Sequence, residues 1–155
     1  MEIRRESLVR VTSEADLTER ESNLIEQARI AADNAYAPYS EFHVGTALKL
    51  SDGEIVLGNN QENAAYPSGL CAERVAIFAA KANHPNKSID EVMIVVKTDK
   101  ALKQGFTPPC GSCLQVLWDV QNRQNSPIKI HVQSPDKTLY SVDNVNQFLP
   151  FGFEL

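Results

Sequence analysis

The sequence predicts an α/β domain in which helices cover a mixed β-sheet, and three observations support this. The chain has 155 residues, of which 43% are hydrophobic and 23% charged, the size and composition of a single globular domain. In some segments apolar residues recur at helical intervals, whereas in others they alternate with polar residues or form short continuous runs, as is typical of strands. After an opening hairpin these two kinds of segment alternate, an order typical of strands that run parallel where helices connect them.

The first half of the chain begins irregularly and then becomes periodic. Residues 1–12 are expected to form an extension or an edge strand. A helix is predicted over residues 18–34, because Thr18 and Glu21 have capping-box spacing and apolar residues follow at helical intervals. Strands are then predicted at residues 44–50 and 54–60, joined by a turn with the sequence SDG.

The second half alternates helices and strands. The expected elements are a loop at 61–69, a helix beginning at Cys71, a strand at 89–97, a loop at 98–109, a helix at 110–123, a strand at 128–134 and a short helix at 142–149. Two of these helices therefore begin at cysteines, each after a loop that contains proline.

The charge and the apolar pattern exclude several classes of function. A formal net charge of -5 has the wrong sign for binding nucleic acid or an anionic membrane. No apolar run approaches the roughly 20 residues that span a bilayer, and the start MEIRRESLVR lacks the apolar core of a signal peptide. We therefore expect a cytoplasmic protein that has no nucleic-acid or membrane partner and keeps its cysteines reduced.

The three cysteines have the arrangement of a metal site. Cys71 lies at one predicted helix start, and Cys110 and Cys113 form a C-x-x-C motif at another. Unpaired N–H groups and the helix dipole favour thiolate at such positions. Thiolates bind zinc at about 2.3 Å, and three protein ligands leave one tetrahedral position open, as in catalytic zinc sites. If the two helix starts meet, the three cysteines would bind one Zn²⁺ per chain.

Glu73 follows Cys71 by two residues, close enough to face water at the open position without binding the metal. Zinc lowers the pKa of its water to about 7, and a neighbouring carboxylate can move the protons. Cys71-x-Glu73, followed later by the sequence PCGSC at residues 109–113, matches the zinc-deaminase signature. Together the two motifs use every cysteine in the chain.

Beyond this signature, the chain resembles the small homotetrameric cytidine deaminases that act on free nucleosides, from about residue 24 to residue 155. The segments that carry the resemblance are YAPYSEFHVGTAL, GNNQENAAYPSGLCAERVAI, PPCGSCLQVL and the C-terminal LPFGFEL. The resemblance implies a layered α-β-α fold with a mixed five-stranded sheet. It also implies an N-terminal extension over residues 1–15, a catalytic domain over 16–155, and a homotetramer with sites shared between subunits.

The implied activity is hydrolytic deamination of cytidine and 2'-deoxycytidine to uridine and 2'-deoxyuridine, with release of ammonia, as in pyrimidine salvage. Zinc-bound hydroxide would attack C4 of the ring while Glu73 shuttles protons. The implied substrate contacts are Asn60 and Glu62 with the ribose hydroxyls, Phe42 beside the nucleoside, the N–H of Ala72 with the pyrimidine O2, and Phe153, or alternatively Phe151, reaching in from a neighbouring subunit.

One position departs from the family pattern. Many members have arginine after the last zinc cysteine, whereas this chain has Leu114. Three thiolates on one Zn²⁺ carry a net charge of -1, and this excess makes the metal a poorer acid for its water. Arg74 is the cation still available to donate to a sulfur. We therefore expect zinc retention and turnover to depend heavily on Arg74.

Other interpretations remain open at this point. The same signature occurs in deaminases of blasticidin-type antibiotics, which would change the substrate. Cys110 and Cys113 alone have the spacing of a thioredoxin-like redox pair. A non-catalytic structural zinc would need a fourth ligand, for which the histidines of the chain are His43, His84 and His131; His84, in a turn, and His131, in a strand, are more typical of surface or core positions.

Overall fold

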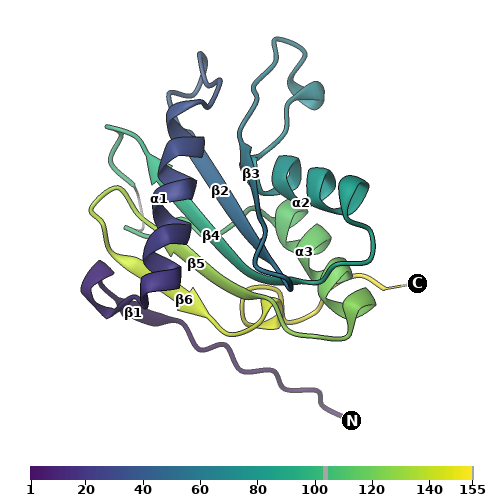
Figure 1. Cartoon of the computed structure of the whole chain (residues 1–155). Coiled ribbons are helices and arrows are strands. Elements are labelled where there is room, and N and C mark those ends of the chain that lie inside the picture. Colours follow the sequence, from purple (N-terminus) through teal and green to yellow (C-terminus); the bar gives the residue numbers. More distant parts are fainter. Residues whose placement is uncertain (103–104, 155) are drawn as a thin grey trace.

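The computed structural model describes residues 1–102 and 105–154 and contains a single sheet between layers of helices (Figure 1). Residues 103 and 104 of the predicted loop and residue 155 of the C-terminal segment lie outside the described residues. Helix α1 (Glu19–Asp33) covers one face of the sheet, and helices α2 (Ala72–Asn83) and α3 (Gly111–Gln124) cover the other. The predicted α-β-α layering is confirmed.

The sheet is mixed, as predicted, with the strand order β1-β6-β5-β4-β2-β3. Its strands are β1 (Arg10–Thr12), β2 (His43–Leu50), β3 (Ile55–Asn59), β4 (Ile89–Lys97), β5 (Lys129–Gln133) and β6 (Leu139–Val142). Strands β4 and β5, which α3 connects, are parallel, and the other pairs are antiparallel. This is the arrangement expected for strands joined by a helix.

Two expectations about the edge of the sheet were wrong. The sheet has six strands rather than five, because residues 10–12 pair with β6 and form an outer strand. The short helix expected at 142–149 is instead the end of β6 followed by a single 3-10 turn, Val145–Gln147. Leu139 and Val142 are fully buried in the sheet, so these residues gain more from strand pairing and burial than a short exposed helix would provide.

Helix α1 begins as its sequence predicts. The N–H of Glu21 donates to Oγ1 of Thr18 (3.3 Å), and the N–H of Thr18 donates to Oε2 of Glu21 (2.8 Å), which completes the capping box. Glu21 is itself buried and reaches a polar cluster under the helix, where Glu91 also lies and His131 Nε2 is 2.8 Å from Glu91 Oε1. His131 is therefore a core residue with hydrogen-bond partners.

Two glycines let the helices approach the β2–β3 hairpin closely. A Cβ at Gly45 would lie 2.0 Å from the carbonyl oxygen of Ala28 in α1, and a Cβ at Gly58 would lie 2.5 Å from that of Ala72 in α2. Only glycine fits at such distances. Gly58 thus fixes the start of α2 against the sheet.

Among the described residues, no helix is long and apolar enough to cross a membrane.

Candidate functional site

The starts of α2 and α3 meet, as the cysteine pattern requires. Cys71 and Cys110 are the N-cap residues of these helices, with extended backbone conformations. The Sγ atoms of Cys71 and Cys110 lie 3.9 Å apart, and those of Cys110 and Cys113 lie 3.5 Å apart. Tetrahedral zinc with Zn–S distances of about 2.3 Å requires sulfurs about 3.8 Å apart. The three thiols therefore fit a zinc ion.

The charge around the sulfurs favours thiolate at Cys71. A hydrogen bond from Cys113 and a further contact from Nη2 of Arg74, 3.6 Å from Sγ, lower the pKa of Cys71 to about 5. The donating thiol of Cys113 has its pKa raised correspondingly, and burial adds to this. Leu114 is buried and supplies no donor, so Arg74 is the cation that contacts a sulfur, as expected.

Glu73 lies in the first turn of α2, and its side chain is only 6% exposed. Burial raises the pKa of its carboxyl to about 7, and the charge of Cys71 acts in the same direction. A carboxyl with such a pKa can both accept and release a proton near neutral pH. The structure thus places a buried carboxyl with a raised pKa beside the sulfurs.

A cavity of about 360 Å³ opens beside these residues. It is lined by Ser40, Phe42, Val44, Asn60, Glu62, Cys71, Ala72, Glu73, Ile94, Val96, Thr107, Pro108, Pro109 and Cys110. This volume is in the range of small-molecule sites, and the lining combines apolar walls with a few polar groups, as such sites do. The cavity brings together every site residue expected from the sequence except Phe153, Cys113 and Arg74. Of these three, Cys113 contacts the sulfur of Cys110, and Arg74 contacts that of Cys71.

Asn60 and Glu62 also have structural roles that the sequence did not reveal. The amide of Asn60 accepts from the N–H of Val44 and donates to the carbonyl of Phe42, both at 2.8 Å, and so fixes the entry to β2. Oε2 of Glu62 accepts from the N–H of Tyr39 at 2.8 Å. Hydrogen bonding by Ser40 and this N–H lowers the pKa of Glu62, which keeps the carboxylate ionised at the cavity wall.

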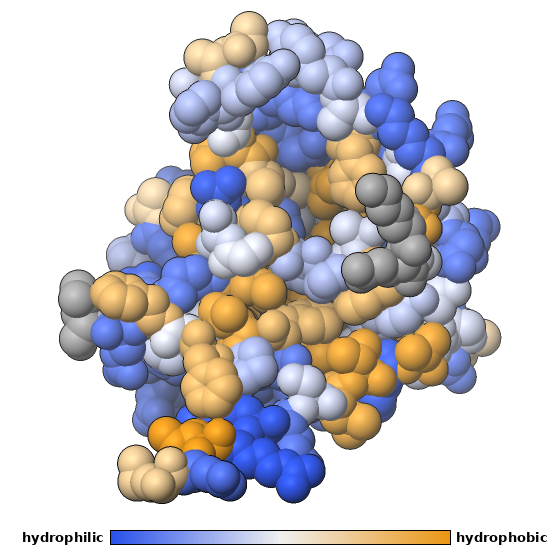
Figure 2. Space-filling view, turned by 180° about the vertical axis from the view of Figure 1, so that it is seen from behind, coloured by the Kyte–Doolittle hydropathy of each residue, from blue (hydrophilic) through white to orange (hydrophobic). Residues whose placement is uncertain are grey.

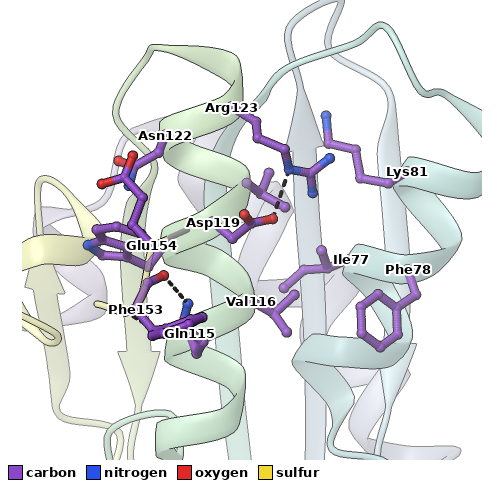
Figure 3. A pocket seen from close by; sticks show the side chains of 12 residues that line it. Ile77, Phe78, Lys81, Gln115, Val116, Asp119, Asn122, Arg123, Phe153 and Glu154 are labelled. Carbon is purple, nitrogen blue, oxygen red and sulfur yellow. Dashed lines mark hydrogen bonds and ion pairs between the residues drawn. The ribbon is translucent and has the colours of Figure 1, made fainter. Parts of the chain in front are cut away.

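Phe153 lies elsewhere in its own chain. It lines a separate groove of about 650 Å³ between α2 and α3, where its backbone is hydrogen-bonded to Gln115 (Figure 3). Phe151 and Phe153 are 63% and 68% exposed as whole residues. Seen from the α2 and α3 side, apolar residues extend across the middle of the molecular surface (Figure 2). Neither Phe151 nor Phe153 lines the cavity beside the cysteines in its own chain.

The wall that residues 107–109 form along the cavity was not predicted from the sequence. The centroid of the Phe106 ring lies 4.2 Å from that of Tyr140 and 5.9 Å from that of Phe148. This packing attaches the wall to β6 and to the 3-10 turn that follows it. The two prolines have no N–H to donate, so side-chain packing holds the segment. Pro109 could have been noticed from its place before Cys110; Phe106 gave no local signal.

The histidines do not complete the sulfur cluster. Among the described residues, the groups whose ligand atoms lie close enough to hold a metal ion are the three cysteines and, separately, Glu21 with Glu91 and His131. In that second group Lys129 pairs with Glu21 (2.5 Å) and Lys49 with Glu91 (3.1 Å). Protein cations thus already neutralise these carboxylates, and the group is best described as a buried ion-pair network.

Comparison with known proteins agrees with this site. A family described as "Cytidine and deoxycytidylate deaminase zinc-binding region" matches residues 1–107, which include Cys71 and Glu73 and end before Cys110. A cytidine deaminase of Halalkalibacterium halodurans is 40% identical over 94 residues, 61% of this chain and 67% of the relative. One of Sporosarcina psychrophila is 40% identical over 99 residues, 64% of this chain and 68% of the relative.

Solved structures show the same fold. The crystal structure of cytidine deaminase from Burkholderia pseudomallei superposes with a TM-score of 0.71 at 33% identity, covering 88% of this chain and all of the other. That from Mycobacterium tuberculosis gives a TM-score of 0.65 at 30% identity, covering 87% and 98%. With three thiols that fit zinc and a buried carboxyl beside them, the chain belongs to the cytidine and deoxycytidylate deaminase family with this zinc-binding region.

Proposed function

We propose that the protein deaminates cytidine and 2'-deoxycytidine by hydrolysis, giving uridine or 2'-deoxyuridine and ammonia. One observation carries the proposal: the buried carboxyl of Glu73 lines the same 360 Å³ cavity as the sulfur ligands Cys71 and Cys110. Relatives with this fold that are about one third identical are named cytidine deaminases. Zinc held by the three thiolates would supply a Lewis acid that makes water nucleophilic at neutral pH.

Glu73 is the residue that moves protons in this proposal. Its carboxylate takes a proton from the attacking water and delivers it to N3 of the pyrimidine, then takes the second proton from the hydroxyl now on C4 and passes it to the departing amino group. Attack at C4 forms a tetrahedral carbon, and its collapse breaks the C–N bond, so that ammonia leaves. The burial that raises the pKa of Glu73 suits a group that must change protonation state within each turnover.

The remaining cavity residues would orient the nucleoside. The N–H of Ala72, at the start of α2, would donate to the pyrimidine O2, because N–H groups in a first helical turn have no partner within the helix. Glu62 and Asn60 would bind the ribose hydroxyls; the backbone N–H groups of Tyr39 and Ser40 both donate to Oε2 of Glu62, so Oε1 can accept from a ligand. Phe42 would pack against the nucleoside.

We also propose that the active protein is a homotetramer in which Phe153 reaches the cavity of a second copy. The groove between α2 and α3 presents Phe78, a residue that is 47% exposed, and Phe153 on opposite sides (Figure 3). It also carries Lys81 and Arg123 together with Asp119. A surface with exposed aromatic rings and charges of both signs is suited to self-association across a two-fold axis.

The experiment that tests the activity compares the wild-type protein with Glu73→Gln. We expect about one zinc per chain in both proteins, ammonia release from cytidine only in the wild type, and a fall in turnover of several orders of magnitude in the variant. A panel of cytidine, deoxycytidine, cytosine, dCMP, adenosine and blasticidin S defines the substrate. Substantial turnover by Glu73→Gln would remove Glu73 from its role, and a zinc-free wild type with a Cys110–Cys113 disulfide would favour redox chemistry.

Shared sites can be tested by mixing an inactive variant with one that binds the nucleoside weakly. Glu73→Gln supplies an intact Phe153, and Phe153→Ala supplies an intact Glu73. After the subunits are dissociated and reassembled together, mixed oligomers should deaminate cytidine at low concentration faster than either variant treated alone. Sedimentation would report the number of subunits. A monomeric active enzyme, or mixing without any recovery, would contradict the proposed sharing.

A further inference from the structure

The C-terminal segment of the chain is attached to α3 at a defined position. Nε2 of Gln115 donates to the carbonyl oxygen of Phe153, and the N–H of Phe153 donates to Oε1 of Gln115, both at 2.9 Å (Figure 3). One side-chain amide thus satisfies both polar groups of a single residue's backbone, as a neighbouring strand would. Terminal residues are normally mobile unless they are held in this way.

A second contact fixes the same segment one helical turn further along α3. A Cβ at Gly152 would lie 2.2 Å from Cδ2 of Trp118, so the backbone lies directly on the indole ring and only glycine fits. Gln115 and Trp118 are three residues apart and therefore lie on one face of the helix. Together they hold the backbone of Gly152 and Phe153 at two adjacent points.

These contacts hold the backbone and leave the aromatic ring free. Phe153 as a whole residue stays 68% exposed, although a contact that served only to bury a loose end would be expected to cover it. The effect of the two contacts is to present this ring at a fixed place beside the α2–α3 groove. Fixing a side chain before it binds reduces the entropy lost when it does.

We infer that Gln115 is a positioning residue for substrate binding, which acts by holding the C-terminal segment so that Phe153 is oriented toward a second copy. The inference rests on the proposed function, in which Phe153 contacts the nucleoside bound by that copy. Gln115 itself touches no reacting atom. Its removal should therefore weaken nucleoside binding and leave the metal centre and the chemical step intact.

The test uses Gln115→Ala and Gln115→Glu in the zinc-loaded protein, with Gln27→Ala in α1 as the matched control on the opposite face of the sheet. The carboxylate of Gln115→Glu keeps the size of the side chain and cannot donate to the Phe153 carbonyl, so it separates the hydrogen bond from packing. Loss of both bonds should lower the equilibrium constant for docking of the segment by about thirtyfold.

Two readouts distinguish positioning from general structural damage. Trp118 is the single tryptophan, so its fluorescence should change when the segment leaves its ring, in both Gln115 variants and in Gly152→Ala. The KM for cytidine should rise by about tenfold while kcat and zinc content stay within twofold, and Gln27→Ala should match the wild type. The double variant Gln115→Ala/Phe153→Ala should show no higher KM than Phe153→Ala alone.

Each result bears on a separate claim. An unchanged KM in both Gln115 variants, or additive effects in the double variant, would overturn the positioning role. Unchanged Trp118 fluorescence would overturn docking by Gln115. A wild-type protein that does not deaminate cytidine would instead refute the proposed function, and the fluorescence measurement would still decide whether Gln115 holds the segment.

Discussion

Replacing Gly58 by alanine should disturb the metal centre through the helix that carries it. The new Cβ would lie 2.5 Å from the carbonyl oxygen of Ala72 and 2.5 Å from the backbone nitrogen of Ala76. Real Cβ contacts essentially never fall below 3.0 Å, and both neighbours are backbone atoms of α2 that no rotamer change can move. The start of α2 would therefore have to shift by about 0.5 Å or more, as judged from those distances.

The substitution should reduce activity as well as stability. Overpacking of this kind costs about 1–3 kcal/mol, and each kcal/mol lowers Tm by about 2–4 °C in a protein of this size. The moved residues include Cys71 and Glu73, and a displacement of about 1 Å at reacting groups can reduce turnover by about a hundredfold. We expect kcat to fall by about tenfold to a hundredfold, with weaker zinc retention.

Gly45→Ala is the matched control. It lies in the neighbouring strand and meets α1, where its Cβ would be 2.0 Å from the carbonyl oxygen of Ala28. It should lower Tm at least as much without moving α2. Circular dichroism melts, zinc per chain and kcat should be measured at a temperature where both variants are folded. Equal kcat and zinc content in Gly58→Ala and wild type, or an equal loss of kcat in Gly45→Ala, would refute the reasoning.

Three further predictions follow from the site and from α1. Phe106→Ala should raise the KM for cytidine several-fold with little change in kcat or zinc content, because the wall at residues 107–109 loses the packing that holds it. Steady-state kinetics test this, and an unchanged KM would contradict it. Arg74→Gln should release zinc faster to a chelator and lower turnover, and equal retention would exclude dependence on Arg74. Burial opposes ionisation of Glu21, but hydrogen bonds from Lys129 and Thr18 prevail and lower its pKa to about 2 from 4.5. Ionised Glu21 therefore stabilises the fold above about pH 4.5, and this stabilisation is lost as the pH falls toward 2. In Glu21→Gln the free energy of unfolding, measured with denaturant, should depend less on pH between about 4.5 and 2. The same pH dependence in the variant and the wild type would contradict this.

Local patterns in the sequence were sufficient where the structure depends on near neighbours. The capping box of Thr18 and Glu21, the hairpin and the helix starts at Cys71 and Cys110 each involve residues close in sequence, so their spacing alone indicates the geometry. The three sulfurs come together because both helix starts lie on one face of the sheet. Their spacing suggested this meeting, and only the fold could establish it.

Features that depend on distant partners could not be predicted. Strand β6 has four residues, was not expected from the sequence, and is held by pairing with β5 and β1. Glu91 interrupts an apolar run, and nothing nearby indicates that Lys49 and His131 would neutralise it. The attachment of Phe153 to Gln115 joins residues 38 positions apart. In each case the stabilising contact comes from tertiary packing, which overrides local preference.

The position of the sulfurs also has a consequence for how the chain folds. Cys71 and Cys110 are 39 positions apart in sequence, yet their Sγ atoms are 3.9 Å apart. A metal that joins them closes this segment, which contains α2 and the central strand β4, into a loop, and closing a loop reduces the entropy of the unfolded chain. Metal loading should thus act as a removable crosslink: in its absence, amide hydrogen exchange should accelerate first in α2 and the start of α3, while α1 remains protected.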